Sequence, residues 1–312
     1  IVIPANNLSN YVKRAAEKLM PIYECIVEII KKAEILHVDE TTLEVLNVKN
    51  KENCYVFVYR TGLYEKIQAS LYVFNEDRKT DRTEKMIEGY KKYLVVDGYT
   101  GYDKLGKSGI KIQRCWTHIR RKFFDCIKIL PEEKRKNTKA GKIVSLINEL
   151  YKYERRFKEE SKIASEVKEL RNGNKYQKIL KEIDDKIISY AKETEKDQKL
   201  KEALNYYINI KEKGELYTYL EDGRIEIDNN LAERTVKPFV IGRKNFLFCK
   251  TENGANISAM MYTIVQTCIN NGLNPEEYIK YVLENIEKKE VEILLPWNDY
   301  IQKEFSIVKK SR

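Results

Sequence analysis

The stretch YLVVDGY, residues 93–99, decides how this chain is expected to fold, because it starts a new strand directly after a helical segment. Its β-branched and aromatic residues are typical of a strand, and the Asp97-Gly98 pair is typical of the turn that ends one. The preceding residues 81–92, DRTEKMIEGYKK, have the pattern of a helix. A strand that follows a helix in this way indicates a mixed α/β protein rather than a simple chain of hairpins.

Three strands are predicted before that helix and one after the turn. The first three lie at 35–47, 54–60 and 67–74 and are joined by short polar loops. The fifth, 110–116, precedes a basic helix at 117–130. The order β-β-β-α-β-α predicts a mixed five-stranded sheet with flanking helices, in which the first strand is central and lies between the second and the fourth.

The remaining segments divide the chain further. Residues 1–34 predict a helical lead-in that Pro21 kinks or splits, and because residue 1 is not Met the chain is expected to be part of a longer polypeptide. Residues 131–220 are rich in Lys, Glu, Ile, Leu and Tyr, and predict an all-α insertion broken at 171–175. Residues 35–130 and 221–290 then form two parts of one domain, and 291–312 form an apolar and then basic tail.

The composition limits the class of protein. Lys and Arg number 58 against 48 Asp and Glu, a net charge of +10 with a pI near 9.0, so a polyanion is the expected partner. Charge alone leaves both nucleic acid and an anionic membrane surface open. No apolar run approaches the roughly 18 residues of a membrane span, and no signal-peptide pattern opens the chain. The six cysteines are scattered, which indicates free thiols in a soluble, intracellular protein.

Acidic residues raise the question of chemistry. Asp97 has an ordinary explanation as a turn residue, but in the predicted sheet it neighbours Asp39 on the first strand. Two neighbouring carboxylates repel, and this calls for a raised pKa, a cation partner or a divalent metal. The segment DNNLAERTVKP offers a third carboxylate, Glu233, with Asp228 as the alternative. Glu233 could instead cap a helix with Asn230, and Asp228 could serve a loop. Glu40 is expected to point away from Asp39, because successive strand residues face opposite ways.

Several motifs resemble the catalytic part of insertion-sequence-66 family transposases, from about residue 8 to residue 298. They are HVDETTLEVLN, YLVVDGYTGYDKL, RCWTHIRRKFF, GRIEIDNNLAERTVKPFVIGRKNFLF, NGA and LLPWN. This resemblance implies an RNase H-like fold and DDE chemistry, meaning metal-dependent DNA strand cleavage and strand transfer. It also implies that Asp39, Asp97 and Glu233 are the catalytic residues and the ligands of two Mg²⁺ ions, for which Mn²⁺ can substitute.

The same resemblance implies further partners and departures. Family members usually carry an N-terminal helical segment and a cysteine-rich DNA-recognition module, which these 312 residues do not contain. The expected partners are double-stranded DNA at the transposon ends and the target, a second copy of the chain, and accessory proteins of the same element. A cytoplasmic, nucleoid-associated location in a bacterium follows, with no membrane partner.

Basic residues near these motifs are the candidate DNA contacts, since guanidinium and ammonium groups bind phosphate. They are Arg120, Arg121, Arg234, Lys237, Arg243 and Lys244. His118 is expected to support the site by hydrogen bonding, Cys115 to be buried, and Trp116 to be a packing residue. Two rival interpretations are an inactive DNA-binding remnant of a transposase and a helical scaffold, the second of which leaves the strands unexplained.

Overall fold

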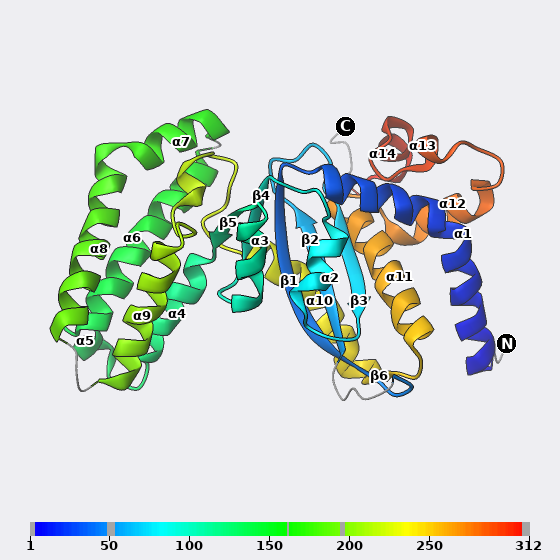
Figure 1. Ribbon diagram of the computed structural model, residues 1–312. Helices are drawn as coiled ribbons and strands as arrows, with labels where there is room; N and C mark the ends of the chain where they lie inside the picture. Colours follow the sequence, from blue (N-terminus) through cyan, green and yellow to red (C-terminus); the bar gives the residue numbers. More distant parts are fainter. Residues whose placement is uncertain (1–3, 49–53, 161, 194–196, 308–312) are drawn as a thin grey trace. The chain divides into compact units, whose positions relative to one another are not determined.

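The structure is a computed structural model that describes residues 4–48, 54–160, 162–193 and 197–307 (Figure 1). The chain divides into two compact units. Unit one comprises Ile1–Lys92 and Leu231–Arg312, and unit two comprises Tyr93–Asn230. Each unit contains both strands and helices.

The sheet of unit one is built from antiparallel strands. β1 (Ile35–Val45) pairs with β2 (Cys54–Thr61), and β2 pairs with β3 (Ser70–Asn75), in the order β3-β2-β1. The short β6 (Phe248–Cys249) runs parallel to the end of β1 and was not predicted from the sequence. β2 therefore flanks β1, as the strand pattern predicted.

Two helices cover one face of these strands. α10 (Asn230–Phe246) and α11 (Glu252–Asn270) bury Val236, Phe239 and Ala255 in a core with residues of all three strands. α11 also satisfies the backbone of β3, because Thr263 Oγ1 accepts a hydrogen bond from the Tyr72 amide at 2.9 Å and Thr267 Oγ1 accepts one from the Ser70 amide at 3.1 Å. A helix thus covers what would otherwise be an exposed strand edge.

Three further helices of unit one are α1 (Ala5–Lys32), α2 (Thr80–Met86) and α12 (Pro275–Asn285). α1 continues through Pro21 and changes direction along its length, so the proline bends the helix without splitting it (Figure 1). α2 is shorter than predicted. α12 starts at the predicted Asn274-Pro275 pair, after Gly272 ends α11 at φ 71°.

The C-terminal segment, predicted as a tail, forms two short helices. It contains α13 (Val291–Leu294) and α14 (Asp299–Phe305), whose Leu294 and Ile301 are fully buried. The short helices were missed because each presents a single apolar anchor rather than a periodic stripe. The basic end of the segment, from residue 308, lies outside the described residues.

Unit two joins a parallel strand pair to a helical block. β4 (Tyr93–Val96) pairs in parallel with β5 (Lys111–Arg114), and between them lie the 3₁₀ turn η1 (Thr100–Tyr102) and α3 (Asp103–Lys107). The basic helix α4 (Trp116–Asp125) follows. The block, green in Figure 1, then comprises α5 (Glu132–Arg135), α6 (Lys139–Glu159), α7 (Ala164–Asn172), α8 (Asn174–Glu193), α9 (Gln198–Glu212) and the 3₁₀ turn η2 (Thr218–Leu220).

The helical block has its own core. Trp116 is fully buried against the rings of Tyr207, Tyr217 and Tyr219, which confirms that it is a packing residue. The guanidinium of Arg171 donates to Glu154 at 2.7 Å inside this core. The break predicted at 171–175 separates α7 from α8.

The predicted fold class is confirmed. The chain is mixed α/β, with antiparallel pairing of β1, β2 and β3 and parallel pairing of β4 and β5, which is consistent with an RNase H-like protein. Among the described helices, none combines the length and the apolar character that a membrane crossing requires.

Candidate active site

Asp97 in unit two stands directly after β4 and is half-buried. Its Oδ1 accepts a hydrogen bond from the backbone amide of Tyr99 at 2.9 Å, which is the local bond by which an aspartate shapes a turn. Asp97 therefore has the turn role that its sequence context predicted. The same bond fixes the orientation of the carboxylate, so it is compatible with a further role.

A buried arginine holds this turn in place. Arg114 on β5 donates through Nη1 to the backbone carbonyls of Asp97 at 2.8 Å and Tyr99 at 2.9 Å. Its remaining nitrogens pair with Asp103 at 2.7 Å and Glu215 at 2.6 Å. The guanidinium is only 2% exposed, so these charge-assisted bonds are shielded from water and rigidify the segment that carries Asp97.

Asp39 lies in the middle of β1 in unit one, opposite Val58 of β2. Directly paired residues share a face, and Val58 belongs to the core under α10 and α11, so Asp39 is on the sheet face that these helices cover. Glu40 is on the other face, where its carboxylate pairs with the guanidinium of Arg78, 2.6 Å from Nε. The predicted opposite orientation of Asp39 and Glu40 agrees with this register.

Glu233 is in the first turn of α10, the helix that packs on the Asp39 face. It precedes Val236 by three residues on the helix, and Val236 is in the core with Val58. The Glu233 side chain is half-buried and its Oε1 is fully so. Because α10 already includes Asn230, the capping pattern proposed for Asn230 and Glu233 starts one residue too late.

Unit one therefore brings two of the three predicted acids to one side of its sheet. Asp39 comes from the strand and Glu233 from the helix that covers it, although they are far apart in the sequence. Asp97 belongs to unit two, in a turn held by its own unit. The convergence of all three carboxylates on one metal site stays a prediction.

The six predicted DNA contacts fall into two groups. Two have protein partners: Arg120 Nε donates to Asn148 at 2.6 Å, and Arg243 donates to the hydroxyls of Thr41 at 3.1 Å and Thr42 at 2.6 Å. Arg243 therefore also ties α10 to β1. The exposed members are Arg121, Arg234, Lys237 and Lys244.

Asp228, Cys115 and His118 are the remaining candidates from the sequence. Asp228 accepts hydrogen bonds from the Asn230 amide at 3.0 Å and its side-chain nitrogen at 2.8 Å, as expected of a loop residue at a helix start. Cys115 is buried as predicted, and its sulfur accepts from the Asn229 amide at 3.2 Å. All six cysteines are free thiols. His118 is half-buried on α4.

One residue near Asp97 was missed by sequence reasoning. Tyr206 of α9 packs on the Asp97-Gly98 turn so closely that a methyl group at Gly98 would lie 1.7 Å from its hydroxyl oxygen. Burial and the charge of Asp97 raise the pKa of the Tyr206 phenol. The only signal in the sequence was the glycine itself, which leaves room for a side chain from elsewhere.

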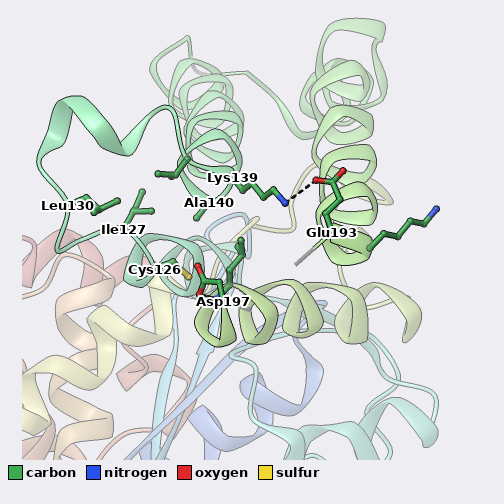
Figure 2. Close-up of a pocket in the computed structure, with 10 residues that line it drawn as sticks. Cys126, Ile127, Leu130, Lys139, Ala140, Glu193 and Asp197 are labelled. Atoms are coloured by element: carbon green, nitrogen blue, oxygen red, sulfur yellow. Dashed lines mark hydrogen bonds and ion pairs between the residues drawn. The ribbon is translucent and has the colours of Figure 1, made fainter. Parts of the chain in front are cut away.

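A separate pocket lies within the helical block (Figure 2). Its lining includes the apolar Ile127, Leu130 and Ala140 and the ion pair of Lys139 and Glu193, at 3.0 Å. Figure 2 shows Cys126 and Asp197 on the same pocket. It contains none of the predicted catalytic or DNA-binding residues.

The fold and these side chains define a class: a mixed α/β protein that carries carboxylates on a strand, after a strand and on a covering helix, together with exposed cations. Comparison with known families is consistent with this. Residues 1–257 match the family model described as Transposase IS66 family, and residues 263–297 match the IS66 C-terminal element. The chain belongs to the IS66 transposase family, as its motifs indicated.

Curated relatives come from Sinorhizobium fredii. The uncharacterized protein y4qI is 29% identical over 299 residues, covering 90% of this chain and 54% of its own length. The uncharacterized protein y4jD is 26% identical over 317 residues, covering 96% of this chain and 60% of its own. The chain thus spans a little over half the length of the curated relatives that it matches.

Proposed function

We propose that this chain is the catalytic part of a DDE transposase, which cleaves DNA at the ends of an insertion sequence and joins them to target DNA. The observation that carries the proposal is the arrangement within unit one, where Asp39 and Glu233 lie on the same side of the sheet. Membership of the IS66 transposase family supports it.

The donor atoms suit divalent magnesium. All three proposed ligands are carboxylates, and hard oxygen donors are what Mg²⁺ prefers. Asp39 Oδ1 accepts the Glu40 amide at 3.0 Å and Asp97 Oδ1 accepts the Tyr99 amide at 2.9 Å, so a backbone N–H orients each aspartate before any ion binds. We infer that Asp39, Asp97 and Glu233 hold two ions, with Mn²⁺ as a substitute.

The chemistry has two steps. Water first attacks a phosphodiester and breaks its P–O bond, which frees a 3′ hydroxyl; this hydroxyl then attacks a phosphodiester of the target and displaces its 3′ oxygen. When bound, two metal ions activate the attacking oxygen and stabilise the leaving one. The exposed Arg121, Arg234, Lys237 and Lys244 hold the backbone of double-stranded DNA by charge. Because two transposon ends must meet, we also propose that the chain acts as a homodimer, with or without accessory proteins of the same element.

Neighbouring carboxylates of β1 supply a matched test. Asp39→Asn is expected to abolish Mn²⁺-dependent nicking of a supercoiled plasmid and to weaken Mn²⁺ binding in calorimetry, with the unfolding midpoint unchanged. Glu40→Gln, one residue along and on the opposite face, is expected to keep both. Wild-type protein that binds DNA yet neither binds Mn²⁺ nor nicks would support the inactive remnant instead. Nicking by Asp39→Asn at the wild-type rate would refute the assignment.

A further inference from the structure

The contact of Tyr206 with the Asp97 turn gives the helical block a part in the site. Tyr206 belongs to α9 and Asp97 follows β4, and both are in unit two. A methyl group at residue 98 would lie 1.7 Å from the Tyr206 hydroxyl oxygen. Any residue other than glycine at this position would therefore displace either the turn or the phenol. The absence of a side chain at Gly98 thus creates the space in which the hydroxyl sits.

Cations that could attract a phosphate lie near Tyr206. The ammonium of Lys122 on α4 lies 5.5 Å from the centre of the Tyr206 ring, and the Asp97 carboxylate also acts on the phenol electrostatically. Arg121 is also close enough to influence the phenol, and both cations are exposed. A DNA phosphate drawn to Arg121 and Lys122 would therefore approach the Tyr206 hydroxyl.

Protonation makes the hydroxyl a donor. An ordinary tyrosine has a pKa of about 10, so the phenol carries its proton at the near-neutral pH of a DNA cleavage assay. A neutral hydroxyl donates to a phosphate oxygen without repelling it. The same protonation argues against attack on DNA by a tyrosinate.

We propose that Tyr206 is a DNA-contacting residue, which donates a hydrogen bond to a phosphate oxygen of the strand bound at Asp97. This rests on the proposed function, because it takes the strand at Asp97 to be the substrate. It makes the helical block more than a structural insertion, since α9 would supply a group to the reaction centre.

The test removes one oxygen atom and has a control on the same helix. Tyr206→Phe is compared with Tyr207→Phe, whose hydroxyl is already bonded to Asp184 at 2.8 Å and Tyr217 at 2.7 Å inside the block. Fluorescence anisotropy with a random-sequence 30-base-pair duplex in Mg²⁺ gives the dissociation constant. Loss of a hydrogen bond to a charged group predicts that Tyr206→Phe weakens binding by about tenfold. Tyr207→Phe is expected to bind as wild type does.

Two further measurements separate this inference from the proposed function. Tyr206→Phe is expected to keep the wild-type Mn²⁺ affinity in calorimetry and to slow plasmid nicking, whereas Asp97→Asn loses both. Gly98→Ala, which displaces the phenol, is expected to weaken DNA binding as Tyr206→Phe does. If Tyr206→Phe binds and nicks like wild type, the inference is overturned while the carboxylate assignment stands. If Asp97→Asn nicks normally, the proposed function falls first.

Discussion

Replacement of Arg114 by methionine tests how the Asp97 turn is held. The guanidinium is 2% exposed and donates to two backbone carbonyls and two carboxylates, all within 2.9 Å. Methionine fills similar volume but donates nothing. Asp103 keeps the ammonium of Lys213 as a partner at 2.6 Å, so the group left with an uncompensated charge is Glu215, whose side chain is 11% exposed.

Loss of one partner from a buried ion pair costs about 3–5 kcal/mol. Because Asp103 retains its lysine and is 30% exposed, we expect the lower end, about 3 kcal/mol, for Arg114→Met. Adding Glu215→Met removes the stranded carboxylate, so the double variant should recover about 1–2 kcal/mol. Mn²⁺ affinity should fall in both variants, since neither restores the bonds to the turn.

Urea unfolding measures these differences. In a Trp297→Phe background the remaining tryptophan, Trp116, lies in unit two, so its fluorescence follows that unit. Two results would refute the view that the buried bonds of Arg114 hold the Asp97 turn. One is a loss of less than about 1 kcal/mol in the free energy of unfolding for Arg114→Met, and the other is a double variant no more stable than the single variant.

Two other predictions concern single side chains. Lys244→Gln should lower the slope of log affinity for DNA against log salt by about 0.9 without changing stability, because Lys244 is exposed; anisotropy across a salt series measures it, and an unchanged slope removes Lys244 from the DNA interface. Burial, with Asp197 and Asp125, raises the pKa of the Cys126 thiol, so alkylation of Cys126 by iodoacetamide should reach half its maximal rate at a higher pH than alkylation of free cysteine in the same assay. A half-maximal rate at the same pH as for free cysteine, or at a lower one, would contradict this environment.

Local patterns predicted most of what unit one shows. Strand alternation alone placed Asp39 and Glu40 on opposite faces, and the register with Val58 and the Arg78 partner agree with it. Gly272 and the Asn274-Pro275 pair marked the end of α11 and the start of α12. Such signals work because the cause lies within a few residues of the effect.

Contacts between distant segments could not be read in this way. β6 has two residues, and only its partner on β1 makes it a strand. Arg243 stays a predicted phosphate contact, and its bonds to Thr41 and Thr42, which join α10 to β1, could not be predicted from the sequence. Tyr206 lies against Gly98 because α9 packs on the turn. Neither the sequence of α9 nor the sequence of the turn indicates this contact.

The central claim, that three carboxylates grip divalent ions, is tested most directly by diffraction from crystals soaked in Mn²⁺, using anomalous scattering to locate the metal. The account predicts manganese within about 2.2 Å of carboxylate oxygens from Asp39, Asp97 and Glu233 together. Manganese bound elsewhere, or coordinated by the aspartates with Glu233 turned away, would contradict it.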